Sequence, residues 1–130
     1  MYVLDTNTVS YYLKGQGRIA ERLLAAAPTD VVLPAVVVYE LLHGAGRAQA
    51  PRALRRGLDM LLGTVGCLPF GEAEARTAAR IRLDLEAVGA PIGPVDVLIA
   101  ATALAHRGVL VTRNTRGFGR VESLRLENWY

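Results

Sequence analysis

The sequence has a single cysteine, Cys67, and no cluster of cysteine and histidine at the spacing of a zinc site. One cysteine cannot form a disulfide within the chain, which excludes a disulfide-stabilised secreted scaffold, and the missing cluster excludes a zinc ribbon. We therefore expect a reducing, cytoplasmic setting. In Val65–Leu68, Cys67 is expected to be a small residue of the core.

Long hydrophobic runs are also absent. The longest one, 97–105, has nine residues even with Thr102 counted, whereas a membrane helix needs roughly 18. The first five residues lack the basic segment of a signal peptide. With 130 residues, 52% of them apolar and 21% charged, we expect one globular domain over 1–130 that does not span a membrane.

Lysine is nearly missing, since Lys14 is the only one among fifteen basic residues and the other fourteen are arginines. The net charge is +3 and the pI about 9.4. Arginine binds phosphate with two parallel hydrogen bonds, which an ammonium group cannot do. Two explanations stay open at this point: an anion-binding surface, or the coding bias of a G+C-rich genome.

Short apolar stretches alternate with helical patterns along the whole chain. Strands are predicted at 2–5, 31–33, 65–68, 109–112 and 124–126, and helices at 19–27, 35–44, 51–62, 72–88 and 94–106. The buried side of the longest helix is expected to hold Ala75, Ala78, Ala79, Ile81, Leu83 and Leu85. The three valines of 35–44 leave strand as an alternative there. The alternation predicts an α/β fold in which a parallel sheet carries helices on both faces.

Polar residues follow two of the predicted strands. The strand at 2–5 ends in Asp5-Thr6-Asn7, and the strand at 109–112 ends in Thr112-Arg113-Asn114. Because the carboxyl ends of parallel strands meet at one edge of a sheet, these segments should lie together.

Two further acids occur in apolar surroundings, Glu40 after Val36-Val-Val-Tyr and Asp96 before Val97-Leu-Ile-Ala. Asp5 and Asp96 each have a simpler explanation as helix caps, and Glu40 has one as a partner of His43. A buried carboxylate must be paired, protonated or bound to a cation. Three converging acids without a nearby lysine favour a hard divalent cation, Mg²⁺ or Mn²⁺.

Five segments resemble the PIN-domain ribonucleases, specifically the VapC toxins of bacterial toxin-antitoxin pairs. They are Val3-Leu-Asp-Thr-Asn7, Tyr39-Glu-Leu-Leu-His-Gly44, Pro91-Ile-Gly-Pro-Val-Asp96 with Val97-Leu-Ile-Ala-Ala-Thr102, Leu110-Val-Thr-Arg-Asn114 and Leu126-Glu-Asn-Trp129. The resemblance covers the whole chain in order and implies the PIN-like α/β fold. It also implies Mg²⁺-dependent cleavage of tRNA or ribosomal RNA by an activated water, which leaves 5′-phosphate and 3′-hydroxyl ends.

Site roles follow from the same resemblance, which places Asp5, Glu40 and Asp96 as catalytic metal ligands. Thr6, Asn7, Thr112 and Asn114 are expected as supporting polar residues. Relatives often carry an acid where this chain has Gly117. Its absence favours one firmly held metal, and a second ion would need substrate phosphate to complete its shell.

RNA contacts are expected from Arg113, Arg116 and Arg120, which follow the strand at 109–112 and could equally be solvated surface residues. The resemblance implies a VapB-type antitoxin and a homodimer. The antitoxin is expected to cross the active-site groove, with Val9, Tyr11, Tyr12 and Leu13 exposed for docking.

Two other functions compete with this interpretation. A non-catalytic PIN-like scaffold that binds RNA or a partner fits Gly117 but leaves the three acids unexplained. A Mg²⁺-dependent phosphoaspartate phosphatase would need an acid at Asn7 and a lysine late in the fold, whereas the only lysine is Lys14.

Overall fold

The computed structural model describes residues 1–130, and it contains one parallel sheet of five strands in the order β3-β2-β1-β4-β5. The strands are β1 (Tyr2–Leu4), β2 (Val31–Pro34), β3 (Gly66–Leu68), β4 (Val109–Val111) and β5 (Arg125–Glu127). The helices are α1 (Thr6–Leu13), α2 (Ile19–Ala25), α3 (Ala35–Ala45), α4 (Arg52–Leu62), α5 (Glu72–Ala87), α6 (Pro94–Ala105) and α7 (Thr115–Phe118), with a 3-10 turn η1 (Pro28–Asp30). The predicted α/β class is confirmed.

The order of the strands determines where a site can form. From β1 the chain adds β2 and β3 on one side of the sheet, then returns to add β4 and β5 on the other side. The connections after the neighbouring strands β1 and β4 run to opposite sides of the sheet, and this opens a crevice at their carboxyl ends, as in other parallel α/β folds. The crevice therefore lies beyond Leu4, where Asp5 begins.

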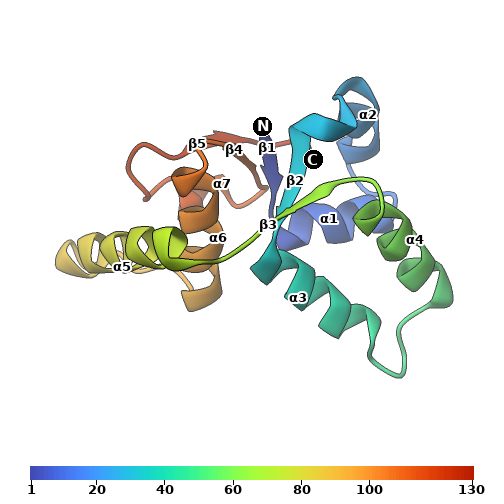
Figure 1. Ribbon diagram of the computed structural model, residues 1–130, viewed down its shortest axis with the longest axis horizontal. Helices are drawn as coiled ribbons and strands as arrows, with labels where there is room; N and C mark the ends of the chain where they lie inside the picture. The colour runs from blue at the N-terminus through green and yellow to red at the C-terminus, as the bar shows by residue number, and fades with distance from the viewer.

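Apolar residues on both faces of the central strands explain why helices cover them. Val3, Leu4, Leu110 and Val111 have no exposed surface and belong to the hydrophobic core. In Figure 1, α2, α3 and α4 lie to the right of the sheet, whereas α5 extends to the left and packs mainly on α6. None of the helices is long and apolar enough to cross a membrane.

Local sequence explains most element boundaries. The valine-rich segment 35–44 is helical, and it follows directly from β2 with Pro34 at its N-cap. The helix predicted at 19–27 ends earlier, at Ala25, because Pro28 begins η1. Two helices were not predicted, α1 and the one-turn α7.

The expected buried side of α5 is partly wrong. Its buried positions are Glu74, Ala78, Ile81 and Leu85, whereas Ala75, Ala79 and Leu83 are exposed, Leu83 by 64%. Since α5 packs mainly on α6, only a narrow stripe of the helix is covered. Because α5 is rich in alanine, its sequence did not predict how narrow the buried face of the helix is.

Cys67 also differs from its prediction, because it is exposed and not part of the core. It lies on β3, an edge strand that pairs only with β2, where Cys67 is opposite Leu33. An edge strand has solvent on one side, so an apolar residue there is not necessarily buried.

Candidate active site

Asp5 is fixed at the end of β1 by hydrogen bonds to both of its carboxylate oxygens. Oδ1 accepts from the backbone N–H of Thr8 (2.8 Å) and thereby caps α1, while Oδ2 accepts from the hydroxyl of Thr112 (2.6 Å). The side chain is only 5% exposed. The capping role that the sequence left open for Asp5 is therefore real, and it orients the carboxylate toward the crevice edge of the sheet.

Glu40 comes from α3 and is partly buried. The hydroxyl of Thr6, the first residue of α1, donates a hydrogen bond to Glu40 Oε1. The alternative pairing with His43 is not formed, because Glu40 accepts from Thr6 and His43 is exposed. Thr6 thus connects the start of α1 to α3 and holds the second acid.

Asp96 lies in the first turn of α6, but no side-chain hydrogen bond caps this helix. The capping explanation that the sequence allowed for Asp96 is therefore not supported. Burial raises the pKa of Asp96 above its usual value, and the negative charges of Asp5 and Glu40 raise it further. The three acids consequently lie close enough to repel one another.

One small cleft of about 110 Å³ gathers these residues from three different elements. It is lined by Asp5, Thr6, Asn7, Glu40, Asp96 and Ile99. No lysine or arginine is among them, and the three acids do not stand close enough together to form a complete three-ligand metal site by themselves. An open, oxygen-lined cleft with uncompensated negative charge fits a hard divalent cation that keeps several of its waters.

Thr112 and Asn114 have different tasks. Thr112 is fully buried, donates to Asp5 and accepts from the backbone N–H of Asn114 (3.0 Å), so it positions the first acid. The Asn114 side chain is turned to the backbone, where its Oδ1 accepts from Gly117 N–H (3.1 Å) and caps α7. A Cβ at position 117 would lie 2.5 Å from Asn114 Nδ2, so an acid there would displace this cap.

The three arginines expected to bind RNA lie in three different settings. Arg113 packs its guanidinium on aromatic rings, with 3.6 Å from its carbon to the centre of the Tyr130 ring. Arg120 donates to the carbonyl of Pro91 (2.9 Å), and Arg116 is exposed. The contact with Tyr130 was missed, because nothing in the local sequence indicates that residues 17 positions apart stack.

The docking residues expected on α1 are not freely exposed. Val9 is completely buried, and Tyr11, Tyr12 and Leu13 are partly buried against the core. The reason is that α1 packs against α2, α3 and α4. Exposed apolar side chains occur elsewhere, among them Leu24, Tyr39, Leu42 and Met60.

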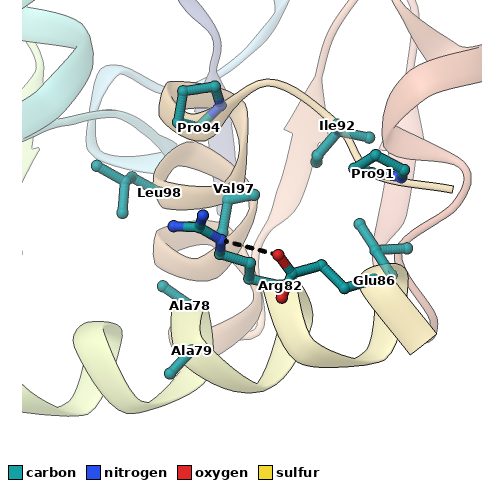
Figure 2. A pocket seen from close by; sticks show the side chains of 10 residues that line it. Ala78, Ala79, Arg82, Glu86, Pro91, Ile92, Pro94, Val97 and Leu98 are labelled. Atoms are coloured by element: carbon teal, nitrogen blue, oxygen red, sulfur yellow. Dashed lines mark ion pairs between the residues drawn. The ribbon is translucent and has the colours of Figure 1, made fainter. Parts of the chain in front are cut away.

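A larger apolar cleft of about 440 Å³ lies between α5, α6 and the loop before α6. Figure 2 shows Pro91, Ile92 and Val97 around it and an ion pair between Arg82 and Glu86 (3.5 Å). It contains none of the three acids. We therefore place the candidate chemistry in the smaller acidic cleft.

Comparison with known proteins agrees with this geometry. A model of the PIN domain matches residues 2–124. The chain is 30% identical over 128 residues to the tRNA(fMet)-specific endonuclease VapC of Shigella flexneri, and the match covers 98% of this chain and 97% of that protein. It is 32% identical over 131 residues to ribonuclease VapC1 of Haemophilus influenzae strain R2866, and this match covers 99% of this chain and 98% of that protein. Its fold is similar to VapBC2 from Rickettsia felis bound to a promoter DNA fragment, with a TM-score of 0.91, 30% identity, and 99% and 98% coverage.

Proposed function

Since this chain belongs to the PIN-domain family and to its VapC ribonucleases, we propose that it is the Mg²⁺-dependent toxin of a toxin-antitoxin pair and cleaves tRNA or ribosomal RNA. The single observation that carries the chemistry is the acidic cleft. Asp5, Glu40 and Asp96 come from three separate elements and share one cavity in which no cation of the chain compensates them. Such an arrangement is costly for folding unless a bound cation offsets it.

Hydrogen bonds from the chain position two of the acids, and the third, Asp96, accepts no hydrogen bond from the chain. Asp5 is held by Thr8 and Thr112, and Glu40 is held by Thr6. A Mg²⁺ or Mn²⁺ ion bound by the three acids would stabilise the charge of the scissile phosphate and lower the pKa of a water for in-line attack. No side chain needs to act as the nucleophile, so the expected products carry 5′-phosphate and 3′-hydroxyl ends.

The polynucleotide is expected to reach the cleft past Arg113 and Arg116, while Arg120 is already bonded to the carbonyl of Pro91. Phosphate contacts of this kind give affinity that falls with salt. The Shigella flexneri relative is a tRNA-specific endonuclease by name, which favours tRNA over ribosomal RNA as the substrate.

We expect an antitoxin to bind at the same cleft. Similar structures include VapBC assemblies from Rickettsia felis and Salmonella typhimurium, both bound to DNA. We propose a VapB-type partner for this chain, which acts in the cytoplasm as a homodimer. An arginine or lysine inserted by the partner would satisfy the three carboxylates as a cation does. Of the docking residues expected on α1, Val9 is in the core and is not available to a partner, whereas Tyr11, Tyr12 and Leu13 are half-buried.

The decisive experiment combines cleavage with growth. Purified wild type with Mg²⁺ should cut total RNA and leave 5′-phosphate ends, whereas Asp5→Asn should be inactive and Asp59→Asn, an exposed acid on α4, should behave like wild type. In cells, wild type alone should arrest growth, and the protein encoded by the neighbouring gene should restore growth and co-purify.

Each failure has its own meaning. RNA binding without cleavage would support the scaffold alternative, and a stable aspartyl-phosphate on Asp5 would support the phosphatase. Cleavage without growth arrest or rescue would contradict the toxin assignment and leave the nuclease intact.

A further inference from the structure

Arg113 differs from the other anchored arginines in what holds it. Its guanidinium carbon lies 3.6 Å from the centre of the Tyr130 ring and 5.5 Å from that of Tyr11. It takes part in none of the ion pairs of the molecule. A cation at this distance from a ring face is attracted to it and loses rotational freedom. Arg113 is therefore immobilised while its N–H groups stay free.

The other arginines that are held in place use their N–H groups to do so. Arg55, Arg120 and Arg125 donate to backbone carbonyls, and Arg22 donates to a carboxylate of Glu127. These guanidinium groups have part of their hydrogen-bonding capacity occupied by the protein. Only the flat face of Arg113 toward Tyr130 is occupied, so its N–H edge is available to a ligand.

The ring beneath Arg113 is itself fixed. Tyr130 packs edge-on against Tyr11, with ring centres 4.9 Å apart. Its carbonyl accepts from Arg18 N–H (3.1 Å), and its N–H donates to Asn128 Oδ1 (2.9 Å). A Cβ at Gly17 would lie 2.9 Å from the ring, so the ring lies directly on the glycine backbone. This support makes Tyr130 a rigid base for the guanidinium.

Arg113, stacked on Tyr130, is next in the chain to a residue that contacts the acidic cleft. Arg113 follows Thr112 directly in the chain, and the Thr112 hydroxyl donates to Asp5. The Cα atoms of Thr112 and Arg113 are therefore about 3.8 Å apart. Tyr11 belongs to α1, the helix that Asp5 caps. Arg113 and Tyr130 are both exposed, Tyr130 by 40%, so a ligand can reach the guanidinium from solvent.

We infer that the Arg113 guanidinium, supported by Tyr130, is a stacking platform for one nucleobase of the RNA next to the scissile phosphate. A guanidinium plane stacks on any base, because every base has a flat π face. Its N–H edge remains free for a neighbouring phosphate. The inference rests on the proposed nuclease function and adds recognition of a base to that of the backbone. Arg116 lacks such support and contributes charge only.

The test separates base from phosphate binding. Binding of a short labelled oligoadenylate is compared with that of an abasic ribose-phosphate strand of the same length, in EDTA and at constant salt. Wild type should prefer the strand with bases by about five- to 150-fold, the range expected for one stacked base. Arg113→Lys keeps the charge but should reduce this ratio toward one. Tyr130→Phe should retain the ratio and Tyr130→Leu should lose it.

A matched control uses the second cation-aromatic pair of the molecule, in which Arg22 lies 5.3 Å from the centre of the Trp129 ring. Arg22→Lys should keep the wild-type ratio. Melting temperatures of all variants establish that they are folded. With a cleavable RNA and Mg²⁺, Arg113→Lys should raise KM and leave kcat nearly unchanged, since it removes binding only.

The outcomes distinguish this inference from the nuclease proposal. Equal binding of the two strands by wild type, or an unchanged ratio in Arg113→Lys, overturns the stacking platform even if wild type cleaves RNA. Absence of any cleavage by wild type contradicts the nuclease, and the ratio measured in EDTA still decides the stacking question.

Discussion

Two acids begin helices on the same edge of the sheet, and their surroundings differ. At the start of α1, both oxygens of Asp5 accept hydrogen bonds from the chain. At the start of α6, Asp96 caps nothing, and burial together with the charges of Asp5 and Glu40 raises its pKa. Asp5 therefore stabilises the fold as well as forming the cleft, whereas the charge of Asp96 opposes folding. A carboxylate of the second kind indicates a ligand more strongly than one of the first.

The largest effect on stability is expected at Asp5. Asp5→Ala removes the cap of α1 and leaves the buried Thr112 hydroxyl without its acceptor, which together should cost about 2–4 kcal/mol of unfolding free energy. Asp5→Asn should cost less, because an amide oxygen still accepts from Thr8. Urea unfolding measures both, with Asp84→Ala on the exposed side of α5 as control. Equal stability of Asp5→Ala and wild type would remove the distinction between the two acids.

The second-largest effect on stability is expected when a divalent metal ion is added to the wild type. At a Mg²⁺ or Mn²⁺ concentration ten times the Kd, binding to the folded state adds about 1.4 kcal/mol and raises the melting temperature. Asp96→Asn should show a clearly smaller rise, because one ligand and one negative charge are gone. Identical melting of both proteins with and without metal would argue against a shared metal site.

The smallest effect concerns Asp96 in the absence of metal. Its raised pKa means that the folded protein holds this proton more tightly than the unfolded chain does. The related stability is present below the ordinary value of 3.8 and is lost as pH rises through the raised pKa. In EDTA at neutral pH, Asp96→Asn should therefore melt slightly above wild type, by about 1–3 °C. The difference should vanish near pH 4, and a difference independent of pH would contradict the explanation.

The three acids were predictable because each breaks a local pattern. Asp5 ends an apolar strand, Glu40 interrupts an apolar helix, and Asp96 precedes the most apolar segment of the chain. Charges at such places are costly, so their occurrence is informative without a structure. The opposite case is seen at Cys67 and Leu83, which were predicted to be buried and are exposed, and at Val9, which was predicted to be exposed and is buried. Whether an apolar residue is buried depends on what packs against it, and local sequence does not contain that information.

By itself, the sequence determined the alternation of strands and helices, the α/β class and the identity of the three acids, since these depend on local periodicity and on the cost of burying charge. Tertiary structure alone decided that Thr112 holds Asp5, that Thr6 holds Glu40, and that Tyr130 supports Arg113. These contacts join residues 17 to 107 positions apart. They form only when the sheet order brings β2 and β4 to the two sides of β1 and when Tyr130 lies against the turn after α1.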